Sequence, residues 1–136
     1  MCTEMKVWKQ LYLIVWLAFL QIIIILLPVF GGSLVDLHAL LGFIILGLAH
    51  YDYAMLKRTE IPHRLKRIAK STAILATVQV VLGLILYANV RLNVSIPLVE
   101  VIVFIHLVIA LAIITQAASV ATAYDMWEEH EFTSTK

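Results

Sequence analysis

The chain has 136 residues, of which 62% are hydrophobic and only 14% are charged. This composition excludes an ordinary soluble domain, in which about a quarter of the residues are charged. The formal net charge is +1 and most cations lie beside the long apolar runs, so we expect no nucleic-acid partner. The single cysteine, Cys2, excludes an internal disulfide and any site built from several cysteines.

Four apolar runs in the sequence predict four membrane-spanning helices. About 20 apolar residues in a helix suffice to cross a bilayer core of about 30 Å. The runs cover residues 11–30, 34–56, 68–90 and 97–124, with short connections between them. We therefore expect residues 1–136 to form a single all-α domain that spans the lipid bilayer.

The cations predict how these helices are oriented. Residues 57–70 hold six of the ten cationic side chains, and Lys6 and Lys9 precede the first run. Because cytoplasmic segments are enriched in Lys and Arg, both of these regions are expected on the cytoplasmic side of the plasma membrane. Arg91 is the one cation expected outside. The prediction is an up-down four-helix bundle with both termini cytoplasmic, in which the second and fourth helices are diagonal partners.

Two histidines lie in the outer halves of these diagonal helices. His38 lies in the first turns of the second run, and His106 follows Pro97 by nine residues. A histidine is costly in lipid and is expected to face protein or a cofactor. Imidazole suits iron, and two axial histidines in a helical bundle are a common heme arrangement. We interpret His38 and His106 as metal ligands of a heme. The alternative is two unrelated histidines bonded to neighbouring helices.

Other residues in the expected membrane region have two interpretations each. Gln79 and Gly83 lie one turn apart on the third helix, where they would admit a porphyrin or serve ordinary helix packing. Asp36 and Glu100 are the acids expected on the outer side. They either mark the water boundary or handle protons beside the cofactor, and Asp36 is preferred because it is closer to His38.

The remaining histidines are expected to lie away from the heme. His50 would be an interfacial residue beside Asp52, because the matching part of the fourth run offers no partner ligand. His63 in the basic connection and His130 near the end of the chain are expected to be solvated.

Several short motifs resemble the heme A synthase family. They are a His-Ala-Leu-Leu-Gly opening of the second helix, a Gln-x-x-x-Gly pattern in the third, a proline in the outer connection and a His-Leu pair in the fourth. The resemblance covers residues 34–120. The matching positions, in chain order, are His38, Gly42, Gln79, Gly83, Pro97 and His106.

The resemblance implies an activity and a cofactor. Members of the family oxidise the C8 methyl of heme O to a formyl group and so produce heme A. Their usual form has eight helices in two similar halves, and this chain is similar to one half, which implies a homo-oligomer. His38 and His106 would be the heme ligands, and Gly42, Gln79 and Gly83 would contact the heme. The bound heme would be heme B, or heme O and heme A as substrate and product.

The chain departs from the family pattern in two places. Val35 occupies the position at which the family's catalytic half has a glutamate, and the cysteine pair of the outer loop is absent. Two alternatives therefore stay open. One is a small b-type cytochrome that exchanges electrons with a quinone. The other is a non-catalytic, heme-binding assembly subunit that contacts partners in a terminal oxidase.

Overall fold

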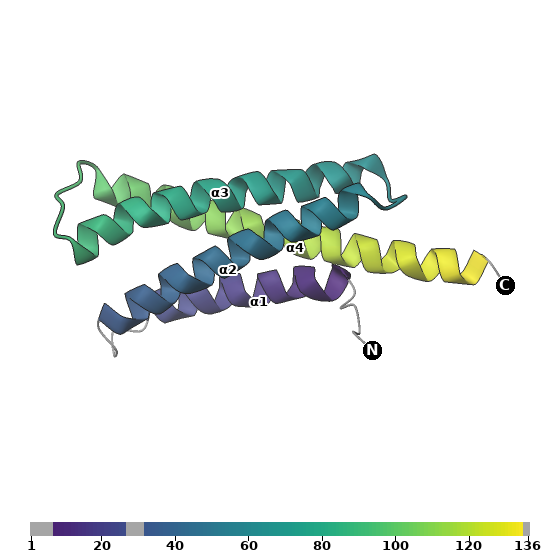
Figure 1. Cartoon of the computed structure of the whole chain (residues 1–136), viewed down its shortest axis with the longest axis horizontal. Helices are drawn as coiled ribbons and strands as arrows, with labels where there is room; N and C mark the ends of the chain where they lie inside the picture. Colours follow the sequence, from purple (N-terminus) through teal and green to yellow (C-terminus); the bar gives the residue numbers. More distant parts are fainter. Residues whose placement is uncertain (1–6, 27–31, 135–136) are drawn as a thin grey trace.

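The computed structural model of the chain describes residues 7–26 and 32–134. It contains four helices, α1 (Val7–Leu26), α2 (Gly32–Lys57), α3 (His63–Arg91) and α4 (Val99–Ser134) (Figure 1). The predicted all-α class is confirmed. The end of the first apolar run and residue 31 of the predicted turn at residues 31–33 lie outside the described residues, whereas residues 32 and 33 form the start of α2 and not a turn.

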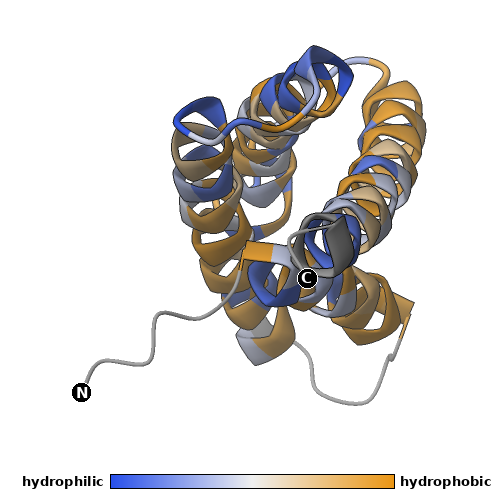
Figure 2. Ribbon diagram, turned by 90° about the vertical axis from the view of Figure 1, so that its right-hand side faces the viewer, coloured by the Kyte–Doolittle hydropathy of each residue, from blue (hydrophilic) through white to orange (hydrophobic). Residues whose placement is uncertain are grey.

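All four helices are long and apolar enough to cross a membrane, judged by length and composition. Figure 2 shows hydrophobic residues along the lengths of the helices and hydrophilic residues gathered mainly near their ends. In a bilayer, a helix satisfies its backbone hydrogen bonds internally, so such helices can be exposed to lipid. The chain is therefore a multi-pass membrane protein by this criterion.

Two of the helices extend well beyond the predicted spans. α3 begins at His63, so part of the basic connection is helical, and α4 continues to Ser134 through a polar segment. Charged residues end an apolar run but do not interrupt backbone hydrogen bonding, so the helices continue beyond the apolar residues. α3 begins directly after Pro62, whose extended ψ of 136° keeps it outside the helix.

The connection between α3 and α4 is closed by local hydrogen bonds. Asn93 has a φ of 53°, and the amide of Val94 bonds back to the Ala88 carbonyl at 3.3 Å. The Asn89 side-chain amide also donates to the Val94 carbonyl at 2.9 Å. Asparagine is one of the few residues that tolerate the left-handed conformation after a helix. This turn places the end of α3 beside the start of α4.

The helices contact one another in a ring. The main contacts join α1 to α2, α2 to α3, α3 to α4 and α4 back to α1.

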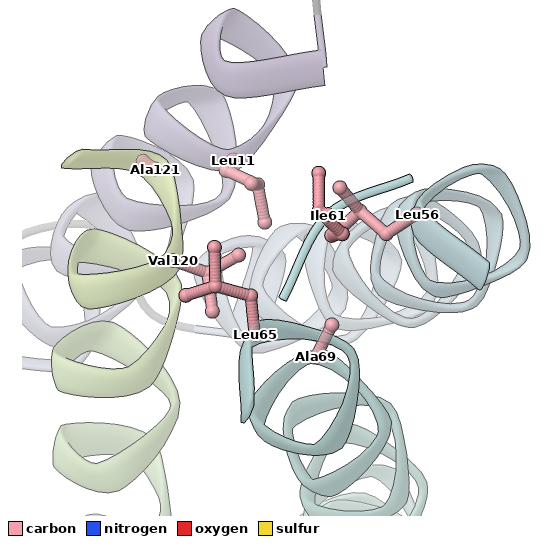
Figure 3. Packing of buried hydrophobic residues seen from close by; sticks show 7 residues of the cluster. All are labelled: Leu11, Leu56, Ile61, Leu65, Ala69, Val120 and Ala121. Carbon is pink, nitrogen blue, oxygen red and sulfur yellow. The ribbon is translucent and has the colours of Figure 1, made fainter. Parts of the chain in front are cut away.

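Two groups of buried apolar residues occupy successive levels inside this ring. The basal cluster lies near the α2–α3 connection, and Figure 3 shows its side chains converging from all four helices. Its members are Leu11, Leu56, Ile61, Leu65, Ala69, Val120 and Ala121.

A second group, the central cluster, follows further from that connection. Four of its members are alanines, which allow the helices to approach closely. The central cluster consists of Ile14, Ala18, Ile45, Ala49, Ala76, Ile113 and Ala117. The side chains still further along the bundle, towards the α3–α4 connection, do not close the interior, and a cavity lies there.

Candidate functional site

The cavity at the α3–α4 end of the bundle has a volume of about 350 Å³ and is lined by all four helices. Most of its lining side chains are apolar. A concave apolar site with a few polar groups is the usual form of a small-molecule or cofactor site. The polar lining residues are Gln21, His38, Gln79, Tyr87, Asn89 and His106.

His38 on α2 and His106 on α4 lie close together in this cavity. Their ring centroids are 6.2 Å apart, and the ring planes are inclined by 47°. Both side chains are half-buried. The Nδ1 atom of each ring is buried and has no hydrogen-bond partner among the described residues. The structure thus brings together the two histidines that the sequence analysis selected.

The distance between the two ring centroids equals that of two imidazoles on one metal ion, and it also lies within the range of about 4.5–7 Å for ordinary contacts between aromatic rings. An imidazole nitrogen binds a first-row metal such as zinc at about 2.0–2.1 Å, and the ring centroid lies roughly 1.1 Å further, so two coaxial imidazoles have centroids roughly 6.3 Å apart. The observed distance is 6.2 Å. The described residues contain no group of three or more metal-ligating side chains. A heme brings its own equatorial nitrogens and needs only axial ligands from the protein.

Two glycines border the polar side chains of the cavity. A Cβ atom at Gly83 would lie 3.3 Å from Cε1 of His106, which is closer than an ordinary contact. A Cβ atom at Gly42 would lie 3.6 Å from Nε2 of Gln21, whereas one at Gly47 would meet nothing within 4 Å. Gly83 therefore leaves the space that the His106 ring occupies.

Two glutamines contribute in different ways. The Gln21 side-chain amide donates a hydrogen bond of 3.0 Å to the His38 carbonyl, which ties α1 to the first turns of α2. Gln21 was not predicted to belong to the site, although it stands out in the sequence as a polar residue within an apolar run. Gln79 lines the cavity, and its buried Oε1 has no partner among the described residues.

Asp36 is not among the lining residues, but it contacts one of them. Its carboxylate accepts a hydrogen bond of 3.0 Å from the Tyr87 hydroxyl, and Tyr87 lines the cavity. Arg91 donates from Nε at 3.1 Å and also from a terminal nitrogen, which forms an ion pair. Asp36 thus adjoins the cavity through Tyr87. Neither Tyr87 nor Arg91 was predicted to belong to the site, although Arg91 stands out in the sequence as an isolated cation.

Glu100 lies apart from the cavity. It is exposed in the first turn of α4 and is not one of the lining residues. An acid at this position interacts favourably with the helix dipole, which accounts for Glu100 without a role in the site.

The other histidines also lie outside the cavity. His50 is exposed, and its Nδ1 donates to the Leu46 carbonyl at 3.0 Å. His63 and His130 are exposed near helix ends. Asp52 is buried within the bundle, since its side chain is only 1% exposed, and both carboxylate oxygens lack a partner among the described residues.

Comparison with known proteins yields no match to a family model, to a curated protein or to a solved structure. The functional interpretation of the cavity therefore rests on its residues and on the short motifs that resemble heme A synthases.

Proposed function

We propose that the chain binds one heme in the cavity, with His38 and His106 as its axial ligands, and acts as a heme A synthase-like oxidoreductase. The observation that carries this proposal is the 6.2 Å separation of the two imidazoles. Their buried Nδ1 atoms lack partners, and such unsatisfied groups are uncommon in folded proteins. A ligand in the cavity accounts for the position of both rings.

Each lining group has a role in this proposal. Gly83 leaves space for the His106 ring and Gly42 for the Gln21 side chain. The Gln79 side chain lines the cavity, where its amide can bond to a polar substituent. When bound, a heme would supply the redox chemistry. The substrate change is oxidation of the C8 methyl of heme O to the formyl group of heme A, which takes its oxygen atom from water and releases four protons and four electrons, the electrons passing to an external acceptor.

Asp36 is the proposed proton-handling group, acting through Tyr87. The Tyr87 hydroxyl donates to Asp36 and also borders the cavity, so a proton can pass from the cavity side to a carboxylate that is 44% exposed. Geometry within hydrogen-bond reach is the first requirement for such a group. Glu100 offers no comparable contact.

The arrangement in the membrane is part of the proposal. We propose an up-down bundle in the plasma membrane with both termini cytoplasmic, supported by the ring of helix contacts and the cations of residues 57–70. A reporter fused after Lys136 should then be cytoplasmic, and a reporter exposed outside would contradict this orientation. Because the chain is similar to one half of a heme A synthase, we also propose a homo-oligomer.

The activity is tested by coexpressing the chain with a source of heme O and identifying the extracted heme. Production of heme A is the expected result. The Asp36→Asn variant should retain the bound heme and produce less heme A. Wild-type protein that binds heme but produces no heme A would contradict the enzyme assignment.

One observation favours the alternative function, a b-type cytochrome. Val35 lines the cavity at the position where the resemblance predicts a glutamate, and none of the described lining residues is acidic. A site without a carboxylate suits electron transfer through the heme. Extraction of heme B alone would support this alternative or the non-catalytic assembly subunit.

A further inference from the structure

Arg91 lies beside the α3–α4 end of the cavity, although it is not one of the lining residues. It is the last residue of α3, one turn after Tyr87 and directly after the lining residues Asn89 and Val90. It is also the one Lys or Arg residue between positions 71 and 135. The rest of the lining is largely apolar, so Arg91 is the cation available to a ligand at this end of the bundle.

Asp36 and Tyr87 hold the guanidinium in a defined position. Asp36 accepts from Nε and from one terminal nitrogen of Arg91, while Tyr87 donates to the same carboxylate. A guanidinium has five N–H donors in a fixed plane, and these two bonds to Asp36 use two of them. The Arg91 side chain is 39% exposed, so it remains accessible to a ligand at the edge of the cavity.

We infer that Arg91 binds a carboxylate on the ligand, so that the acidic edge of a planar macrocycle lies at the α3–α4 end of the cavity. This inference rests on the proposed heme binding, because hemes carry two propionate side chains. A charge-assisted bond from Arg to a carboxylate is stronger than a neutral hydrogen bond and depends on direction. Apolar walls hold the macrocycle, and Arg91 selects for its acidic edge.

The test compares heme with heme dimethyl ester, in which both carboxylates are uncharged. Each is titrated into the purified protein in one detergent, and the low-spin absorption is recorded. The measured quantity is the ratio of the Kd for the ester to the Kd for heme. This ratio should be about tenfold higher in wild-type protein than in the Arg91→Gln variant, because hydrogen bonds to charged groups are strong. The Arg91→Lys variant, which keeps the charge but loses the planar donors, should be intermediate.

The control is Arg64→Gln, which removes an exposed cation near the opposite end of α3. It should keep the wild-type preference. Equal preference in wild type and Arg91→Gln would overturn the inference while leaving heme binding intact. If Arg91→Gln does not fold, wild-type protein that binds both molecules equally would overturn it. Failure of both molecules to give a two-histidine spectrum would instead contradict the proposed function.

Discussion

The two ends of the bundle are built differently, although the same four helices form both. Near the α2–α3 connection, the seven residues of the basal cluster are each at most 8% exposed and fill the interior (Figure 3). Near the α3–α4 connection, the interior holds a cavity bordered by glycines and histidines. The close packing near the α2–α3 connection holds the helices together. The α3–α4 end can therefore keep an unfilled space.

Among the described residues, buried polar atoms without partners occur at both ends of the bundle, since Asp52, one turn before Leu56 of the basal cluster, has two such oxygens. Around the cavity, the Nδ1 atoms of His38 and His106 and the Oε1 of Gln79 all lack partners among the described residues. Between the central and basal clusters, Thr72 donates to the side chain of Gln116 at 3.1 Å. Burying an unpaired polar group costs about 1–3 kcal/mol. The three groups at the cavity end differ from Asp52 in that their residues line a space that a ligand can occupy.

Removal of either histidine should have the largest effect. Because groups that only support a metal ligand are worth about 10–100-fold in affinity, His38→Ala and His106→Ala should each weaken heme binding by more than about 100-fold. The measurement is a heme titration followed by the low-spin absorption bands. His50→Ala is the control, since His50 lies outside the cavity, and it should bind heme as the wild type does. An unchanged spectrum in His38→Ala or His106→Ala would contradict the two-histidine site.

A substitution that creates a cavity in the basal cluster should lower the stability of the fold without changing the affinity for heme. Leu56 is completely buried, so Leu56→Ala should lower the free energy of unfolding by about 2–3 kcal/mol. Heme affinity at low temperature should stay within about twofold, because additive behaviour is expected for distant sites. The control is Leu40→Ala on the same helix, because the Leu40 side chain is 58% exposed. The unfolding of both variants is measured in the same detergent. A large loss of heme affinity in Leu56→Ala would indicate that the two ends are not independent.

Replacing single glycines of α2 and α3 by alanine should weaken heme binding to different degrees. Gly83→Ala should weaken heme binding by about tenfold, because overpacking costs about 1–3 kcal/mol and the new Cβ would press on the His106 ring. Gly42→Ala should have a smaller effect, and Gly47→Ala should have none, following their contact distances. Equal affinities across the three variants would show that Gly83 has no special role beside His106.

Asp52→Asn should have the smallest effect. Asp52 is 1% exposed, and its oxygens have no partner among the described residues. Because an amide costs less to bury than a carboxylate, the variant should be about as stable as the wild type or more stable by roughly 1 kcal/mol. Thermal unfolding in detergent measures this, and heme binding should not change. A marked loss of stability would mean that Asp52 has a partner in the membrane.

The sequence predicted the helices well because apolar runs of this length have few other solutions in a membrane. It also predicted which histidines meet, because their positions on the second and fourth helices imply similar depth. The contact of Asp36 with Tyr87 and Arg91 was not predicted, since it depends on how long side chains from two helices reach each other. The burial of Asp52 was also missed, because an acid at the end of an apolar run resembles a residue at the water boundary.

The most direct test of the two-histidine heme site is electron paramagnetic resonance of the purified protein after titration with heme. The proposal predicts one low-spin heme per chain with two imidazole axial ligands, and loss of that signal in both His38→Ala and His106→Ala. A high-spin signal in the wild type, or a low-spin signal that persists in the double variant His38→Ala and His106→Ala, would contradict it.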